Sequence, residues 1–302
     1  MSKNKEVLQK PFLKWVGGKT QIINNILPHI PCVMNNYHEL FLGGGSVLFA
    51  VLSLLKQKKI KIKNNIYAYD INAPLIALYQ HIQTNPTILF NFIERYWNEY
   101  DCIKALKGTK KPASLEEAKT SKESYYYWQR TNYNTTTSSL EHSALFLFLN
   151  KTCFRGLYRE GPHGFNVPYG HYKKTPHMIT KQELEMISHL TKKVRFVCSD
   201  FTKSIKKVKK GDYVYLDPPY APENAKSFVG YTANGFDLAT HKKLFSEIVK
   251  LNENSVKFTM SNAKVALVLD YFQHNVCEEI VARRAINSKN PSSTTTELLI
   301  SN

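Results

Sequence analysis

Four consecutive residues, Asp217, Pro218, Pro219 and Tyr220, combine groups that suit chemistry on an amino nitrogen. An exocyclic amine on an aromatic ring is a poor nucleophile, because its lone pair is delocalised into the ring. The Asp217 carboxylate and the Pro218 carbonyl can each accept one amino hydrogen, which favours a pyramidal nitrogen in line with a sulfonium methyl. The two prolines restrict the backbone φ angles and fix both acceptors in advance. With Tyr220 to stack on the ring, the segment predicts methylation of such an amine.

The position of this segment supports the prediction. It follows an apolar run at residues 212–216, the carboxyl end of a predicted strand, where open α/β sheets bind their ligands. The alternative is a rigid turn in which Asp217 only caps a helix. Chance alone places these four residues in order in about one chain of this length in a thousand.

A glycine-rich segment, FLGGGS at residues 41–46, lies between a predicted strand (37–42) and a predicted helix (46–55) that Ser46 is placed to cap. Glycines let the backbone approach a ligand closely, and a helix N-terminus offers unpaired N–H groups. Asp70 ends the next predicted strand (66–69), where an acidic side chain holds ribose hydroxyls in nucleotide-binding α/β folds. Together they indicate an adenosine-containing cofactor. For Asp70 alone, a helix cap before Asn72 is an equal alternative.

A third segment, KWVGGKT at residues 14–20, places Trp15 and Lys19 beside two glycines. The spacing G-x-x-x-x-G-K-[ST] of a P-loop is absent, so hydrolysis of a nucleoside triphosphate is not indicated. Trp15 is suited to stack on a flat group, and Lys19 to contact a carboxylate or phosphate.

The order of the predicted elements indicates an α/β protein with two domains. Further strands are predicted at 194–198, 256–260 and 297–300, and further helices at 240–251 and 263–272. Strands alternating with helices favour a mostly parallel, doubly wound, Rossmann-like sheet. Residues 73–179 differ, with helix-like stretches at 87–106 and 141–149, an aromatic cluster at 125–128 and a Gly/Arg-rich loop at 152–170. We therefore predict a catalytic domain at 1–72 and 180–302, interrupted by a mainly helical insertion.

The charge favours a polyanionic partner. The chain has 41 Lys and Arg against 24 Asp and Glu, a formal charge of +17. Solubility or codon bias is the alternative reading. Lysines cluster at 56–63 and 203–210, as a solvated face or as a phosphate-contacting stripe.

The remaining composition predicts a soluble intracellular protein without a metal. The five cysteines are odd in number and lack a C-x-x-C pair, so neither a disulfide framework nor a zinc ribbon is indicated. The N-terminus has no apolar core of a signal peptide. The apolar run at 144–149 is far short of the roughly 20 residues that a membrane helix needs.

In the order of these motifs the sequence resembles the Dam-type adenine-N6 DNA methyltransferases (D12 class, alpha group). The resemblance runs from PFLKWVGGK through FLGGGS, YDIN, NKTCFRGLYR, FNVPYG and DPPY to YTANGF. It implies a methyltransferase sheet with an inserted target-recognition domain, S-adenosylmethionine as methyl donor and S-adenosylhomocysteine as product. The implied cofactor-binding residues are Trp15, Lys19, Phe41, Gly43, Gly45, Asp70, Asp200, Phe201 and Asp217.

The loop at 154–159 resembles the β-hairpin loop with which the family enters DNA. By residue chemistry Arg159 suits the edge of a guanine, Leu157 a thymine methyl, and Phe154 a stacking wedge. Where this chain has Arg155, family members commonly carry Asn. The alternative for both arginines is phosphate contact without base readout. The positions implied to lie near DNA are Lys14, Phe154, Arg155, Leu157, Arg159 and Pro168.

The resulting hypothesis is methyl transfer to N6 of an adenine flipped out of double-stranded DNA, within a short palindrome such as GATC. The segment 221–236 is either a loop that closes over the flipped base or an ordinary surface loop. The alternatives are methylation of cytosine N4 or of RNA adenine, and a DNA-binding relative without catalysis. A restriction endonuclease acting separately is a possible partner.

Overall fold

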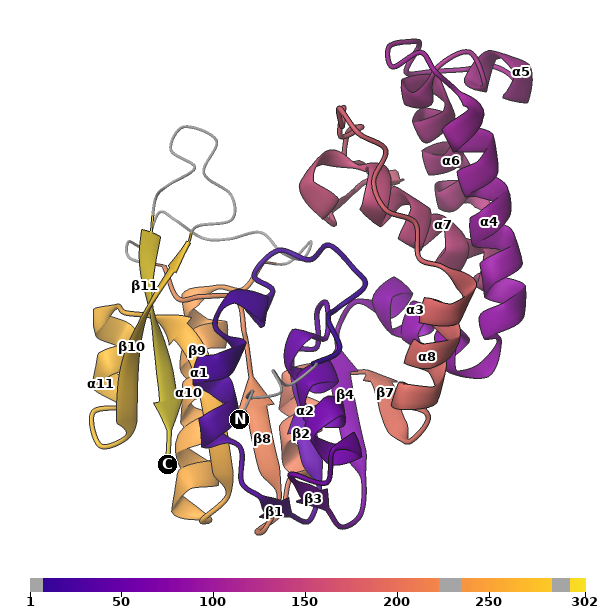
Figure 1. The fold of residues 1–302 in the computed structure, drawn as a ribbon. Helices are drawn as coiled ribbons and strands as arrows, with labels where there is room; N and C mark the ends of the chain where they lie inside the picture. Colours follow the sequence, from indigo (N-terminus) through magenta and orange to yellow (C-terminus); the bar gives the residue numbers. More distant parts are fainter. Residues whose placement is uncertain (1–7, 223–234, 284–293) are drawn as a thin grey trace, which may run out of the picture. The chain divides into compact units, whose positions relative to one another are not determined.

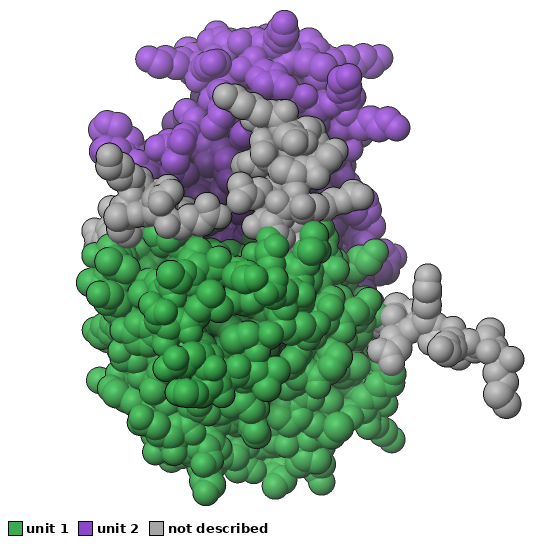
Figure 2. All heavy atoms as spheres, turned by 90° about the vertical axis from the view of Figure 1, so that its left-hand side faces the viewer, with its two compact units in different colours: residues 1–11, 17–71, 193–302 green, residues 12–16, 72–192 purple. Residues whose placement is uncertain are grey.

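The computed structural model describes residues 8–222, 235–283 and 294–302 (Figure 1). Contacts between Cα atoms divide the chain into two compact units, coloured separately in Figure 2. Unit 1 consists of Met1–Pro11, Gly17–Ile71 and Lys193–Asn302. Unit 2 consists of Phe12–Val16 and Asn72–Lys192, and so takes in five residues near the N-terminus besides the long middle segment.

Unit 1 is built on a seven-stranded, mostly parallel sheet, and the predicted α/β class is confirmed. β11 runs antiparallel to both of its neighbours, β10 and β9, and the remaining pairs are parallel. In spatial order the strands are β10 (Val276–Arg283), β11 (Thr294–Ser301), β9 (Lys257–Ala263), β8 (Tyr213–Leu216), β2 (Tyr37–Glu39), β4 (Ile66–Asp70) and β7 (Val194–Cys198). Two short strands, β1 (Val33–Met34) and β3 (Lys61–Ile62), form a separate parallel pair.

The helices of unit 1 supply its core. Side chains alternate along β8, so that Val214 and Leu216 share one buried cluster with Leu244 and Phe245. The helices and 3₁₀ turns are η1 (Lys19–Gln21), α1 (Ile23–Ile26), η2 (Leu27–His29), α2 (Ser46–Lys56), α9 (Phe201–Ser204), η4 (Ile205–Lys207), α10 (Leu238–Glu253) and α11 (Ala266–Tyr271). α2 is buried from Ser46 through Leu54, as expected of a helix that is apolar on all sides.

Three local predictions in unit 1 need correction. Ser46 does not cap α2: the N-cap is Gly45, whose φ of 72° makes the turn into the helix, and it makes no side-chain capping bond. The helix predicted at 263–272 begins only at Ala266, because β9 continues to Ala263. β10 was not predicted, since its acidic residues and its exposed Val276 and Val281 hide the pattern of a buried strand.

Unit 2 is mainly helical. Its elements are α3 (Ala73–Thr84), α4 (Pro86–Cys102), α5 (Leu115–Ala118), α6 (Lys122–Thr135), α7 (Ser139–Thr152), η3 (Phe154–Gly156), β5 (Glu160–Gly161), β6 (Gly164–Phe165) and α8 (Lys181–Thr191). α7 packs against α3, α4 and α6, and its run Ala144 to Leu149 is buried. The aromatic cluster belongs to α6, where Tyr125 and Tyr126 are fully buried. β5 and β6 pair as a short antiparallel hairpin directly after the loop at 154–159.

Polar caps begin several helices of unit 2. The side chains of Asn72, Ser121, Ser138 and Thr180 each accept a backbone N–H of the following helix. At Thr180 the capping box is complete, because Glu183 bonds back to the Thr180 N–H. None of the helices in the described part of the chain is long and apolar enough to cross a membrane.

Candidate functional site

The two main motifs leave the sheet of unit 1 side by side. β2 and β8 are parallel neighbours, with Glu39 registered against Tyr215, and the Leu40 N–H donates to the Tyr215 carbonyl at 3.1 Å. From β2 the chain proceeds to β4 on one side, and β8 lies on the other. Ligands of open α/β sheets bind at such a reversal of strand order, outside the carboxyl ends of the strands. The glycine-rich loop and the DPPY segment both start there.

Asp217 is paired with Lys19. Lys19 Nζ lies 2.9 Å from Asp217 Oδ1 and also donates to the Gly17 carbonyl at 2.7 Å. Only 5% of Lys19 is exposed, and the Asp217 side chain is 20% exposed. Burial raises the pKa of Asp217 to about 6, against the opposing effect of Lys19, and the charge of Glu297 adds to the rise. Asp217 is therefore ionised at neutral pH, as a hydrogen-bond acceptor for an amine requires.

The rest of the DPPY segment is held by residues that the motif does not contain. His241 Nε2 lies 3.1 Å from the Pro219 carbonyl oxygen, and the Ala221 N–H donates to Asn262 Oδ1 at 3.0 Å. The Tyr220 hydroxyl donates to Glu297 Oε2 at 2.7 Å. Sequence reasoning missed all three partners. The position of Asn262 just past a predicted strand was the one signal available.

Glu39 is a second carboxyl group beside this site that the sequence did not single out. It is 2% exposed, and it accepts a 2.6 Å hydrogen bond from the Tyr37 hydroxyl. Burial raises the pKa of Glu39 to about 8, and the nearby charge of Asp217 contributes to the rise. Glu39 is therefore mostly protonated at neutral pH, which leaves the negative charge on Asp217.

The glycine-rich loop is tied to the end of β4. The Gly43 N–H donates to Asp70 Oδ2 at 2.9 Å, and Gly43 and Gly45 have φ angles of 49° and 72°. The alternative that Asp70 caps the next helix is wrong, because Asn72 Oδ1 accepts the Leu75 N–H instead. Asp70 thus stands at the carboxyl edge of the sheet, joined to the loop.

Aromatic rings gather next to this loop. The centroid of Phe41 lies 5.9 Å from that of Phe201 and 6.2 Å from that of Phe236, a residue that sequence reasoning did not select. Asp200 begins α9, and its Oδ1 accepts both the N–H and the hydroxyl of Thr202 at 2.8 and 2.6 Å. The carboxylate of Asp200 therefore orders the turn that presents Phe201.

Trp15 and Lys14 belong to unit 2. The Trp15 ring stacks on Phe146 and Tyr158, with centroids 6.4 and 6.3 Å apart. Lys14 and Asn150 exchange two hydrogen bonds through the Lys14 backbone, at 3.0 and 2.7 Å. The structure thus joins Lys19 to Asp217 in unit 1, while it places Trp15 in an aromatic cluster of unit 2.

The loop at 154–159 presents its side chains in two different ways. Phe154 is 41% exposed, and Arg155 has a left-handed φ of 56° with its guanidinium 5.2 Å from the Phe154 ring. Arg159 is exposed but held: its Nε donates to Asn166 Oδ1 at 2.7 Å. Asn166 is a further residue that the sequence did not single out.

The other positions predicted near DNA differ in exposure. The Pro168 carbonyl accepts the Phe154 N–H at 2.8 Å, and the Pro168 side chain is exposed. Leu157 is half-buried. Most of the segment 221–236 predicted to close over a flipped base, residues 223–234, lies outside the described residues.

Comparisons with known proteins agree with the order of motifs. The sequence profile described as D12 class N6 adenine-specific DNA methyltransferase matches residues 15–287. The type II methyltransferase M.MjaIII of Methanocaldococcus jannaschii is 34% identical over 291 residues, covering 93% of each chain. A DNA adenine methylase of Haemophilus influenzae is 30% identical over 289 residues, 93% of this chain and 89% of its own. The type II methyltransferase M1.LlaDCHI of Lactococcus lactis subsp. cremoris is 29% identical and covers 100% and 98%.

Proposed function

The chain belongs to the D12 class N6 adenine-specific DNA methyltransferases, and from that premise we propose how its residues carry out methyl transfer to adenine N6. The membership decides against cytosine N4 and RNA adenine as the target. The observation that carries the proposal is the Lys19–Asp217 pair at the carboxyl edge of the sheet.

The residues at this edge fit S-adenosylmethionine. Asp70 offers a carboxylate for ribose hydroxyls, Phe41 and Phe201 offer apolar rings for an adenine, and the glycines leave room beside them. Trp15 and Lys19 complete the proposed set by the family resemblance. When bound, this cofactor supplies an electrophilic methyl group on a positively charged sulfur.

The protein's own groups prepare the amine. Asp217 and the Pro218 carbonyl accept its two hydrogens, and Lys19 favours the ionised form of Asp217. Tyr220 stacks on the base. His241 and Asn262 fix the backbone of the segment, so that the acceptors need little reorganisation. The amine nitrogen would take the methyl group that the bound cofactor supplies, with S-adenosylhomocysteine as the leaving group, and its extra proton would be lost to solvent.

The DNA side of the proposal rests on unit 2. A base inside a duplex cannot reach the amine-binding groups and must be flipped out. Phe154, exposed at the start of the loop at 154–159, suits a wedge, and Arg159, held by Asn166, suits a guanine edge. Arg155, Leu157, Pro168 and Lys14 complete the proposed DNA contacts. We infer a short palindromic target such as GATC, and an intracellular role with a separate restriction endonuclease as partner.

A labelled-cofactor assay on adenine-containing duplex DNA tests the proposal. Label should appear in N6-methyladenine after nucleoside analysis, and Asp217→Ala should abolish it. Asp270→Ala, which removes an exposed carboxylate of the same unit, is the matched control and should retain activity. Undiminished labelling by Asp217→Ala would refute the assigned role. Plasmid protection against cleavage at GATC, and none at CATG, tests the target word.

A further inference from the structure

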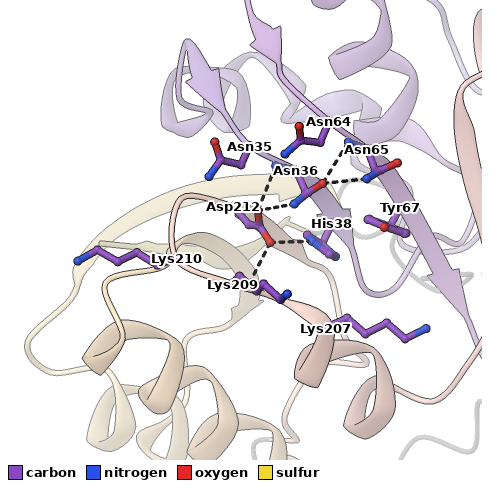
Figure 3. Close-up of a pocket in the computed structure, with 10 residues that line it drawn as sticks. All are labelled: Asn35, Asn36, His38, Asn64, Asn65, Tyr67, Lys207, Lys209, Lys210 and Asp212. Atoms are coloured by element: carbon purple, nitrogen blue, oxygen red, sulfur yellow. Dashed lines mark hydrogen bonds and ion pairs between the residues drawn. The ribbon is translucent and has the colours of Figure 1, made fainter.

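The amino ends of β2, β4 and β8 border a hollow of about 580 Å³, whose lining residues are drawn in Figure 3. It lies at the edge of the sheet opposite to the proposed methyl-transfer site. Its lining residues come from three segments of unit 1: Asn35, Asn36 and His38; Asn64, Asn65 and Tyr67; and Lys207, Lys209, Lys210 and Asp212. Sites for small molecules usually enclose about 300 to 1,000 Å³. Nothing in the proposed chemistry uses this hollow.

Its walls are joined by backbone hydrogen bonds. The Asn35 N–H donates to the Gly211 carbonyl at 2.8 Å, and the Asn64 N–H donates to the Asn35 carbonyl at 2.9 Å. Asn36 then connects the other two segments, because its Nδ2 donates to Asp212 Oδ1 at 2.7 Å and its Oδ1 accepts the Asn65 N–H at 3.1 Å. The three segments therefore form one preorganised frame.

The hollow is rich in uncompensated positive charge. Lys207, Lys209 and Lys210 come from the basic cluster of the sequence, and their ammonium groups form no ion pair with any residue that the structure describes. Asp212 is the carboxylate in the lining, and it is already engaged: it accepts from Asn36 and from the Lys209 N–H at 2.9 Å. An anion with more than one charge would balance these lysines.

The floor of the hollow contains a buried acceptor. His38 is 1% exposed, and its Nε2 lies 3.2 Å from Asp212 Oδ2, while its Nδ1 has no hydrogen-bond partner among the described residues. Burial lowers the pKa of His38, with Lys207 adding to the effect against the opposing influence of Asp212. The ring is therefore neutral, with its proton on Nε2, and Nδ1 offers a lone pair.

We propose that this hollow binds a small phosphate monoester that also carries a hydroxyl or amino group, as nucleotides and sugar phosphates do. The lysines bind the phosphate, and the ligand's O–H or N–H donates to His38 Nδ1. Two observations distinguish this ligand from DNA. The acceptor lies on a buried floor, which the exposed phosphodiester backbone of a duplex does not reach, and that backbone carries no donor. The volume exceeds what a single inorganic phosphate fills.

Titration calorimetry of the full-length protein tests the site with uridine 5′-monophosphate, glucose 6-phosphate, inorganic phosphate and a short DNA duplex. The first two probes lack adenine and so avoid the cofactor site. We expect Lys207→Ala and Lys209→Ala each to weaken binding about tenfold, measured with whichever of the two esters binds the wild type more tightly. Lys206→Ala is the matched control, since this lysine is exposed in the same cluster but does not line the hollow, and it should bind as wild type does.

The ¹⁵N resonance of His38 Nδ1 is the second readout, because general attraction to a basic surface would not move it. It should shift when the ester binds. The proposal is overturned if neither ester binds, if Lys206→Ala weakens binding as much as Lys207→Ala, or if inorganic phosphate binds as tightly as the esters. Binding of the duplex alone, without a shift at His38, would likewise overturn it.

Discussion

The Tyr220 hydroxyl donates a 2.7 Å hydrogen bond to Glu297, so that the last residue of the DPPY segment is anchored to β11. Glu297 also acts on Asp217, since its charge contributes to the raised pKa of that carboxyl group. One side chain therefore influences both the ring proposed to stack on the base and the proposed acceptor of the amine.

Replacing Glu297 with Gln keeps an acceptor for Tyr220 but removes the charge. The pKa of Asp217, about 6 in the wild type, should fall. Because activity requires the carboxylate, the acid limb of the profile of kcat/KM against pH should move to lower pH, measured from about pH 5 to pH 8. Tyr220→Phe removes the hydrogen bond to Glu297 without changing the charge, so the acid limb of its pH profile should stay at the wild-type pH. An upward shift in Glu297→Gln would contradict the assignment.

Replacing Lys19 with Met should have the opposite effect on pH dependence. Lys19 is the main influence that lowers the pKa of Asp217, so its loss raises that pKa and moves the acid limb upward. At neutral pH we expect methyl transfer to fall about 10- to 100-fold. Lys243→Met, an exposed lysine of the same unit, should leave both rate and profile unchanged. Activity equal to the wild type at neutral pH would exclude the proposed role of Lys19.

Glu39→Gln should change the pH dependence of stability. The folded-state pKa of Glu39 is raised to about 8, so the stability linked to its protonated form is present below its unfolded pKa and lost as pH rises through about 8. Gln cannot ionise. Urea unfolding should therefore show the wild type losing up to about 5 kcal/mol relative to the variant between acidic and alkaline pH. A constant difference across this range would show that Glu39 does not titrate as proposed.

Asn166→Ala should weaken sequence discrimination rather than DNA binding in general. Asn166 fixes the guanidinium of Arg159 through its side chain, at 2.7 Å. We expect the ratio of kcat/KM for the cognate word over a single-base variant to fall about three- to tenfold, and further in Arg159→Ala. Lys174→Ala, an exposed lysine of the same unit, is the control and should leave the ratio intact. If Arg159→Ala lowers the rate on all sequences equally and reduces the salt dependence, Arg159 contacts phosphate instead.

Alanine substitutions at two glycines with left-handed φ angles should distinguish the cost of backbone strain alone from the cost of strain together with a steric clash. Gly156 has a φ of +68°, and a Cβ there would lie 2.4 Å from Lys14 Cβ. Gly17 has a φ of +79°, but a Cβ there would meet nothing within 4 Å outside its chain neighbours. Gly17→Ala should therefore cost about 1 kcal/mol of unfolding free energy, and Gly156→Ala about 2 to 4 kcal/mol. Chemical denaturation of both variants measures the difference. Equal losses would show that the loop relaxes around the added methyl group.

The features predicted correctly from the sequence are those that depend on the pattern of neighbouring residues. The apolar runs before Gly43 and Asp217 gave strands that end at one edge of the sheet, and the polar residues after them could be placed there. The predicted bounds of β7 are the observed ones, Val194–Cys198. Its residues alternate between apolar and other side chains, and no turn or helix pattern competes with that of a strand.

What the sequence left unpredicted depends on contacts between distant segments. Glu297, His241 and Asn262 reach the DPPY segment only because β11 and β9 pair next to β8 and because α10 packs on them. α3 and α8 were not predicted, and their positions depend on packing, since α7 packs against α3 and α3 packs against α8. The assignment of Trp15 and Lys19 to different units likewise has no signature in the residues between them.

The pairing of β11 with β9 also affects the order in which the site is completed during synthesis. Synthesis on the ribosome makes Lys19 and Asp217 long before Glu297, and domains fold as their segments emerge. Until β11 has been made and inserted between β9 and β10, Tyr220 lacks its partner and Asp217 lacks the neighbour that helps set its pKa. A nascent chain that already carries Lys19 and the DPPY segment therefore still lacks the contact that anchors Tyr220 to β11.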